Sequence, residues 1–281
     1  MAIHLHKNAY GKNAINLSRI IRHPDSHEIR QLSVDVALEG DFESAHTGGD
    51  NSSILPTDTM KNTVYAFAKE HLTASIETFG VILAGHFIDH NPQIGEVRIT
   101  LTEYCWKRLE VEGKPHPYAF VNGGSEKHVA VIVKSRQALI LSAGIDDLLI
   151  LKTTDSGFSG FIRDQYTTLK ETADRILSTS CNVRWDYQGL PTDPQAAYDA
   201  IRQNLLESFA RHKSLSVQHT LYAMGESVLQ TFPAVTTITL QMPNKHHIPF
   251  NLQPFGLDNN NEVFIATDEP YGMITGTVSR D

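Results

Sequence analysis

Two kinds of hydrophobic periodicity divide the chain into expected strands and helices. Apolar residues alternate with polar or small ones from Leu32 to Leu38, a period-two pattern that is typical of a half-buried β-strand. The segments "EVRITLTEYCW" and "HVAVIVK" predict two further strands. Between them and the first strand, "TDTMKNTVYAFAKE" and "ASIETFGVILAGHFIDHNP" space apolar residues three and four apart, which predicts two amphipathic helices. The apolar face of the second helix is expected to consist of Ile76, Phe79, Leu83 and Phe87.

The second half of the chain repeats this order of elements. The segments "SIETFGVILAGHFIDHNPQIGEVRITL" and "SVQHTLYAMGESVLQTFPAVTTITLQM" align at a constant spacing of 141 residues, so that Ser75 matches Ser216 and Pro92 matches Pro233. At a shorter spacing, "TDTMKNTVY" resembles "TTLKETADR", and this match predicts a helix in the second segment. The second half then carries extra residues, in "CNVRWDYQGLPTDPQAAYDAIRQNLLESF". We therefore predict two tandem domains, residues 1–136 and 137–281, each with the order strand–strand–helix–helix–strand–strand.

This order of elements indicates the α+β fold class. Adjacent strands that pair directly form antiparallel sheets, and the helices then pack on one face. Neither a βαβα alternation nor a G-x-G-x-x-G motif is present, so a Rossmann domain is not predicted. Because open sheet edges must be paired or covered, we expect the tandem sheets to join edge to edge. Copies from another subunit would then close them into an oligomeric β-barrel with its helices outside.

Composition and charge restrict the class of function. A net charge of −8 without a basic cluster argues against a nucleic-acid binder, so the expected partner is a small molecule or another copy of the chain. The two cysteines lack any C-x-x-C partner, which fits a reducing compartment better than a disulfide framework or a zinc ribbon. The N-terminus has no apolar h-region, "ALILSAGIDDLLIL" is too short to span a bilayer, and "VSRD" is not an SKL-type tripeptide. We therefore expect a cytoplasmic protein without membrane contact.

Five short segments carry polar residues that strand or helix formation does not explain: Tyr10–Lys12, Pro56–Thr63, Asp155–Arg175, Ser216–Gln218 and Pro243–His247. In the first two, Lys12 held neutral by burial can act as a base through the hydroxyl of Thr57, which alone is too weak an acid. Alternatively, Lys12 is solvated and Thr57 caps the following helix. Both interpretations stay open and do not exclude each other.

The next two segments offer groups for a planar ligand. Arg175, expected about one turn into a helix, can grip a planar anion by two parallel hydrogen bonds, or pair with a neighbouring acid on an exposed helix face. Gln218 opens the other helix of this half and supplies the donor and acceptor that a heterocycle edge requires, or is an ordinary first-turn polar residue. Phe158, between Gly157 and Ser159, can stack on a ring or anchor its loop in the core.

The segment "PNKHH" contains two adjacent histidines that invite a metal interpretation. Neighbouring residues of a strand point to opposite faces, so His246 and His247 are poorly placed to bind one ion. No H-E-x-x-H, H-x-H or C-x-x-C motif supports a zinc site. Asn244 and His246 are two residues apart and share a face, where an amide beside an imidazole can order a water and move a proton. We therefore predict no metal here and a structural role for His247.

Together these segments resemble the urate oxidase (uricase) family, cofactor-independent enzymes of purine breakdown. The resemblance covers nearly the whole chain, through "YGK", "DFESAHTGGDNSSILPTDTMKNTVYAFA", "HFI", "GFIRDQYTTLKETADRIL", "SVQHTLYAMGE", "MPNKHH" and "LQPFGLDNNNEVFIATDEPYG". The segment "HHIPFNLQPFG" and the lack of a peroxisomal tripeptide are similar to the bacterial branch. The resemblance implies tandem tunnelling-fold (T-fold) domains, a barrel closed by a dimer, and a homotetramer of two stacked barrels with active sites at subunit interfaces.

The resemblance also implies which residues bind the substrate. Arg175 and Gln218 would hold the purine edge, and the backbone amide of Val217 would contact the ligand as well. Phe158 would stack beneath the ring. Ser159 follows this aromatic where some relatives carry a bulkier residue, a departure that concerns local packing rather than the site itself.

A second set of residues is implied for the chemistry. Thr57 and the backbone of Asp58 would come from the neighbouring subunit, with Lys12 behind Thr57. Lys12 and Thr57 would form a proton relay that His246 extends. Asn244, with Thr57, would bind O₂ and then the attacking water above the ring.

The implied reaction is urate + O₂ + H₂O → 5-hydroxyisourate + H₂O₂, without metal or flavin. The protein would hold the urate anion, accept a proton and exclude water until oxygen has reacted. Three alternatives make different predictions. A pterin- or GTP-ring enzyme of the same fold would need a Cys/His zinc site, a non-catalytic purine-binding barrel would release no peroxide, and a metalloenzyme built on the scattered histidines would lose activity with chelator.

Overall fold

The structure, a computed structural model, describes residues 3–281 and divides into two compact units. The first unit extends to Gly144 and includes Asp186–Tyr198, and the second comprises Ile145–Trp185 and Asp199–Asp281. The domain limits at residues 136 and 137 stay a prediction. Among the helices of residues 3–281, none combines the length and apolar character needed to cross a membrane.

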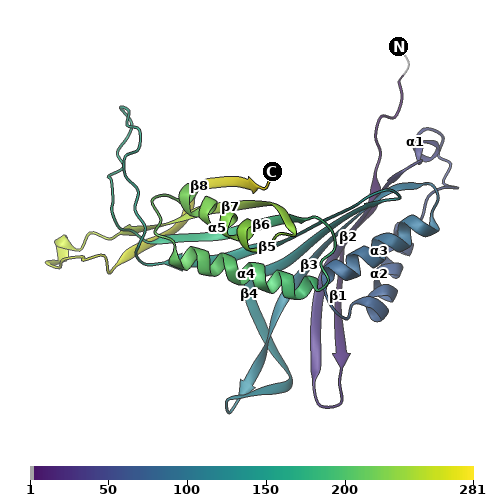
Figure 1. The fold of residues 1–281 in the computed structure, drawn as a ribbon, viewed down its shortest axis with the longest axis horizontal. Helices are drawn as coiled ribbons and strands as arrows, with labels where there is room; N and C mark the ends of the chain where they lie inside the picture. Colours follow the sequence, from purple (N-terminus) through teal and green to yellow (C-terminus); the bar gives the residue numbers. More distant parts are fainter. Residues whose placement is uncertain (1–2) are drawn as a thin grey trace. The chain divides into compact units, whose positions relative to one another are not determined.

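The first unit is an antiparallel sheet with helices against it (Figure 1). Its strands pair in chain order, and α2 packs on β1 while α3 packs on β3 and β4. The elements are β1 (Tyr10–Arg22), β2 (His27–Gly40), α1 (Glu43–Gly48), α2 (Thr57–His71), α3 (Ile76–His90), β3 (Ile94–Val111) and β4 (Lys114–Ser135).

The remaining elements repeat this order, and most of their residues belong to the second unit. The strand order is again the chain order, β7 and β8 are antiparallel, and α5 packs on both of them. The elements are β5 (Leu139–Lys152), β6 (Leu177–Tyr187), α4 (Pro194–Arg211), α5 (Val217–Thr231), β7 (Val235–Pro249), the 3-10 helix η1 (Gln253–Phe255) and β8 (Phe264–Ser279). The predicted α+β class and the predicted order of elements are therefore confirmed, apart from the extra short helix α1.

The core follows the predicted periodicity. The side chains from Leu32 to Leu38 alternate between buried and half-buried along β2, and the predicted apolar face of α3 is buried. Gly80 on this face lies so close to the sheet that an added Cβ would stand 2.3 Å from Ile132. A small residue at this point lets α3 approach the strands closely, and burial of such apolar faces stabilises each unit by roughly 25 cal/mol per Å².

The internal repeat is confirmed in its longer part and wrong in its shorter part. α3 and α5 begin at matched residues, and so do β3 and β7. Residues 167–175, in contrast, form no helix, and the first helix of the second repeat is α4, inside the segment treated as extra. Local hydrogen bonds explain the difference, because the hydroxyl of Thr167 donates to Asp164 and that of Thr172 to the carbonyl of Asp174. Such bonds compete with helix formation.

Candidate active site

Four of the predicted site residues line one pocket in the second unit. Phe158, Arg175, Asn244 and His246 surround a cavity of about 330 Å³. The loop before β6 supplies the first two residues, and β7 supplies the other two. The remaining lining residues are Leu169, Lys170, Thr172, Asp174, Ile176, Lys245, His247, Ile248, Pro249, Asn261 and Phe264.

Arg175 is the cation that this pocket presents to a ligand. Its guanidinium carbon lies 5.3 Å from the centre of the Phe158 ring, and its Nε is buried without a hydrogen-bond partner within residues 3–281. Burial lowers the pKa of Arg175, although a guanidinium stays protonated at any physiological pH. A buried donor without a partner is unfavourable, so an anionic acceptor at this point would stabilise it. The predicted pairing of Arg175 with a neighbouring acid on a helix face is wrong.

A shift in the pairing of β7 with β8 lies at the polar wall of the pocket. Asn244 pairs with Gly272 and His246 with Thr267, so Lys245 alone stands opposite Asp268–Tyr271 and the extra residues belong to β8. Asn244 and His246 both line the pocket, as do all residues from Asn244 to Pro249, so their shared face stays a prediction. His247 also lines this pocket, and with Lys245 it lines a second cavity of about 490 Å³ next to β5. The opposite orientation of His247 and its structural role stay predictions.

Ser214 connects the loop of Phe158 to the start of α5. Its backbone N–H donates to the carbonyl of Asp155 at 2.9 Å, and its carbonyl accepts from Gly157 at 2.8 Å. Its hydroxyl accepts a hydrogen bond from Thr220 at 2.8 Å and donates to the carbonyl of Ser216 at 3.0 Å. Ser214 is fully buried, so each of these bonds is shielded from water. The loop and the helix are thereby held as one substructure.

Val217 and Gln218 form the first turn of α5, as predicted. Ser216 caps this helix by accepting the backbone N–H of His219 at 3.1 Å. Val217 is buried and Gln218 is exposed, and neither lines the pocket of Arg175. Gln218 therefore reaches the same ligand only if the ligand extends beyond the pocket towards this turn.

Lys12 belongs to the first unit, at the start of β1. It pairs with Val36 and precedes a bulge in which Ala14 has a φ of 54° and donates its N–H to Asp35 at 2.7 Å. The preceding Gly11 is required by a close approach, since an added Cβ would stand 1.8 Å from the carbonyl oxygen of Val36. The "YGK" segment thus sets the position of Lys12 through its backbone.

Thr57 and Asp58 also belong to the first unit and begin α2. Thr57 is the first helical residue, and the N-cap position is held by Pro56, which makes no side-chain cap hydrogen bond in the described structure. The prediction that Thr57 caps the helix is therefore wrong, because Thr57 lies inside the helix and Met60 donates its N–H to the carbonyl of Pro56. Asp58 accepts hydrogen bonds from Lys61 at 2.5 Å and Asn62 at 3.0 Å. The Lys61 hydrogen bond and charge, with a smaller contribution from the charge of Lys12, lower the pKa of Asp58.

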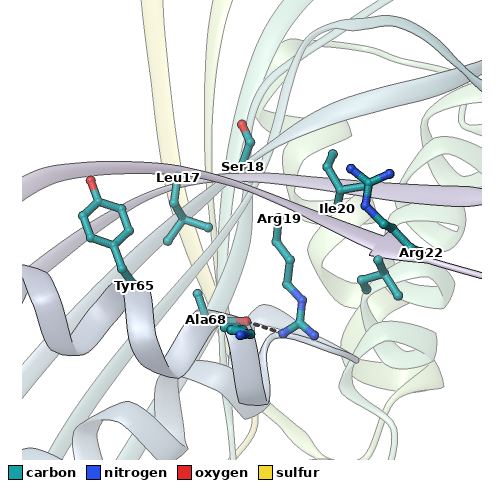
Figure 2. A pocket seen from close by; sticks show the side chains of 9 residues that line it. Leu17, Ser18, Arg19, Ile20, Arg22, Tyr65 and Ala68 are labelled. Atoms are coloured by element: carbon teal, nitrogen blue, oxygen red, sulfur yellow. Dashed lines mark hydrogen bonds between the residues drawn. The ribbon is translucent and has the colours of Figure 1, made fainter.

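A larger hollow lies elsewhere in the first unit and contains none of the predicted site residues. It has a volume of about 560 Å³ and lies between β1 and α2 (Figure 2). Its basic side chains are Arg19, Arg22 and Lys69, and the guanidinium of Arg19 donates to the carbonyl of Ala68. β1 pairs only with β2 among the described strands, so this hollow lies along an open sheet edge.

Neither a metal-ligand cluster nor a reactive thiol at Cys181 is found within the described residues. Residues 3–281 contain no group of three or more His, Cys, Asp or Glu side chains placed to hold a metal ion. Cys181 is fully buried, and burial raises its pKa to about 12, so its thiol is neutral and unreactive at physiological pH.

The sequence predictions did not include several residues that build this site. Ser214 and Thr220 hold the loop to the helix, and Asn261 and Phe264 complete the pocket wall. The only local signal for Ser214 was its place two residues before the N-cap serine. Its pairing with Asp155 and Gly157 joins distant parts of the chain, and no periodicity reports such contacts.

The amino-acid sequence matches a known family along most of its length. The family model described as Uricase matches residues 8–133 and 141–275. The chain is 44% identical over 277 residues to the uricase of Arthrobacter globiformis, which covers 99% of this chain and 90% of that protein. It is 36% identical to the uricase of Dictyostelium discoideum, over 97% of this chain and 96% of that protein.

Solved structures show the same similarity in three dimensions. The crystal structure of uricase from Arthrobacter globiformis superposes with a TM-score of 0.94 at 43% identity, over 100% of this chain and 96% of that chain. The urate oxidase of Bacillus sp. TB-90 superposes with a TM-score of 0.86 at 24% identity, over 97% of this chain and 100% of that chain. The second similarity concerns the fold alone.

Proposed function

The chain belongs to the uricase family and is an enzyme that oxidises urate, and we propose that O₂ is the oxidant and water the second reactant. The proposed reaction is urate + O₂ + H₂O → 5-hydroxyisourate + H₂O₂. Urate gives up two electrons to O₂, which becomes peroxide, and a water adds its hydroxyl to the oxidised ring. The reaction is balanced without a cofactor.

The observation that carries this proposal is the unpaired cation of the pocket. Urate is a flat anion, and Arg175 lies beside an aromatic ring with a buried N–H that lacks a partner within the described residues. A guanidinium fork binds two acceptor atoms on the edge of such an anion, while Phe158 contacts its face. Gln218 and the N–H of Val217 would bind the part of the ring that extends towards α5.

Asn244 and His246 are proposed to act on the other reactants. The amide of Asn244 would position O₂ and later the water, and His246 would receive or return a proton. This assignment is supported by the pocket that they line together with Arg175.

Lys12, Thr57 and Asp58 are proposed to complete the site from a neighbouring subunit. The hydroxyl of Thr57 would transfer the substrate proton to Lys12, and the backbone of Asp58 would contact the ligand. This role is supported by the structure of the α2 start, since the Thr57 hydroxyl is not used for capping. Lys12 lies in the same unit as Thr57, and the close approach of Gly11 to Val36 sets the backbone next to Lys12.

The proposed assembly is a homotetramer in which tandem T-fold domains close into barrels. β1 and β8 are edge strands, whose unpaired backbone groups favour pairing with another chain. Large apolar side chains are exposed on the second unit, among them Leu149 at 60%, Met273 at 53% and Ile265 at 49%. Exposed apolar residues of this kind are expected at subunit contacts.

One incubation tests the reaction. The purified protein is mixed with urate under air, with and without a metal chelator, and both urate absorbance and peroxide are followed. We expect one peroxide for each urate consumed and equal rates in both samples. Urate binding without peroxide release, or a rate that depends on added metal, would contradict the proposal. Sedimentation velocity tests the assembly, and a monomer that remains fully active would exclude a site shared between subunits.

A further inference from the structure

The repeat places residues of the first unit at positions that site residues hold in the second unit. α3 and α5 begin at the same point of the repeat, because their N-caps Ser75 and Ser216 each accept a backbone N–H at 3.1 Å. Glu77 is the second residue of α3, and Gln218 is the second residue of α5. The helix position that offers an amide in the second unit therefore offers a carboxylate in the first.

The strands show the same correspondence. Glu103 stands as far from the start of β3 as Asn244 stands from the start of β7. A shift in strand pairing follows directly after Asn244 and one residue later than Glu103. Arg30, the fourth residue of β2, and Arg175, two residues before β6, both open the sequence R-x-L-S. The first unit thus repeats the arginine, helix and strand positions of the candidate active site.

In the first unit these positions converge on an imidazole. The guanidinium of Arg30 binds both carboxylate oxygens of Glu103, at 2.6 and 2.7 Å. Nε2 of His128, on β4, lies 2.8 Å from Glu77, and its Nδ1 lies 3.8 Å from Glu103. The ring of Tyr198 stacks on the imidazole with centroids 3.6 Å apart and planes inclined by 21°. His128 is thus held at its edges by polar groups and at its face by an aromatic ring.

This arrangement is the one expected around a bound nitrogen heterocycle. In the second unit, the matched arginine and strand positions surround a cavity of about 330 Å³, whereas in the first unit the side chains of Glu77 and His128 are 0% and 3% exposed. Each copy leaves one buried polar atom without a partner in the described structure, Oε2 of Glu77 and Nε of Arg175. The space at these positions is a cavity in the second unit, whereas in the first unit the side chain of His128 fills it.

We propose that the first unit carries a second copy of the heterocycle-binding arrangement, and that the imidazole of His128 occupies it as a built-in ligand. The inference rests on the proposed function only for the role given to the matched residues of the second unit. A carboxylate at Glu77 suits this occupant, since it pairs with an imidazolium, whereas the amide of Gln218 suits an anion. The first unit therefore takes a small basic heterocycle once its own ring is removed.

Chemical rescue of a ring deletion tests this site. His128→Ala leaves two carboxylates and an aromatic face around an imidazole-sized space in the full-length, assembled enzyme. Thermal unfolding is measured over a range of millimolar imidazole concentrations, without urate. We expect Tm of the variant to rise by about 2 to 5 °C at imidazole tenfold above its Kd, by the linkage between ligand binding and folding. The wild type, whose site is filled, should show no such rise.

Two further variants separate a specific site from a general solvent effect. Ile132→Ala removes a fully buried side chain from the same strand and leaves an apolar cavity, so imidazole should not raise its Tm. Adding Glu77→Gln to His128→Ala should weaken imidazole binding at least about fivefold, because the charge-assisted hydrogen bond becomes neutral. Equal shifts in all proteins, or no shift in His128→Ala, would overturn the proposal.

If His128→Ala does not fold alone, refolding from urea decides the question. Imidazole in the refolding buffer should restore soluble protein for His128→Ala and not for Ile132→Ala. Failure of imidazole to restore it would also overturn the proposal. Because neither experiment contains urate, their failure is distinct from failure of the proposed function, which urate consumption by the wild type tests.

Discussion

Replacement of Arg175 tests the site most directly. This residue supplies a positive charge that has no internal partner among the described residues of the pocket. Arg175→Ala removes the guanidinium whose Nε is buried and unpaired within the described residues. It leaves Phe158, Asn244 and His246 in place around an enlarged cavity. The backbone N–H of Arg175, which donates to Ser156 at 2.7 Å, is unaffected by the change. Loss of the side chain should therefore affect ligand binding more than folding.

The magnitude follows from the hydrogen bonds that the guanidinium can make. A hydrogen bond between charged groups contributes about 1.5 to 3 kcal/mol, and the fork can make two. Water that enters the pocket of the variant offsets part of this loss. A net loss of about 3 kcal/mol corresponds to a rise in Kd of roughly 100- to 200-fold. Arg175→Lys keeps the charge without the fork, so we expect a rise of only about tenfold.

The assay combines kinetics with equilibrium binding. KM and kcat are measured from urate absorbance under air, and Kd is measured with oxygen removed, because KM equals Kd only when chemistry is slow. Arg211→Ala is the matched control, since the Arg211 side chain is 81% exposed on α4 and pairs only with Glu207 in the described structure. The reasoning is refuted if Arg175→Ala leaves Kd unchanged while kcat falls, or if Arg211→Ala weakens binding equally.

Three further predictions concern the relay, the support of the site and the buried charges. Lys12→Ala and Thr57→Ala should each lower kcat by about 100- to 10,000-fold with smaller changes in KM, as loss of acid–base catalysis requires, and equal small effects would contradict the relay. Ser214→Ala should raise KM for urate several-fold while kcat stays near the wild-type value. The variant loses a buried hydroxyl whose two hydrogen bonds, worth about 1 to 2 kcal/mol, help to join the Phe158 loop to α5. A lower Tm with unchanged KM would contradict this role. Burial alone raises the pKa of Glu103, but the nearby imidazole of His128 and the hydrogen bonds from Arg30 outweigh it and lower that pKa from 4.5 to about 2. The lowered pKa of Glu103 contributes about 3 kcal/mol of stability above pH 4.5, and this contribution is lost as the pH falls towards 2. Urea unfolding of the wild type and of Glu103→Gln over this pH range should show that only the wild type has this dependence.

The alkaline side of the stability profile has the opposite sign. Burial alone lowers the pKa of His128, but the contacts of its ring nitrogens with Glu103 and Glu77 and the charges of these carboxylates outweigh it, so the pKa is raised above 6.5. Stability from the charged imidazole is complete below pH 6.5 and is lost as the pH rises through the raised value. The same unfolding series, extended to alkaline pH, should therefore show a second decline that His128→Ala lacks.

Wherever the determinant was local, the sequence predicted the structure. The period of apolar residues placed α3 and β2, and the match between Ser75 and Ser216 placed α5, because a cap and an amphipathic face depend on residues within a turn or two. Asn244 and His246 were likewise predicted to share a face from their spacing alone. The register shift that sets Lys245 opposite Asp268–Tyr271 depends on strand pairing and had no signal in this spacing.

Contacts between distant segments decided the rest. Arg175 was expected on a helix, yet its loop is held by pairing of Phe158 with Thr172 and of Ser156 with Ser214. The cluster around His128 also depends on contacts between distant segments, because its members come from β2, α3, β3, β4 and α4. The sequence by itself determined the elements, their repetition and the chemical types present at the site. Only the tertiary structure decided which copy of the site is open and which is filled, because packing of side chains from separate elements has no periodic signal along the chain.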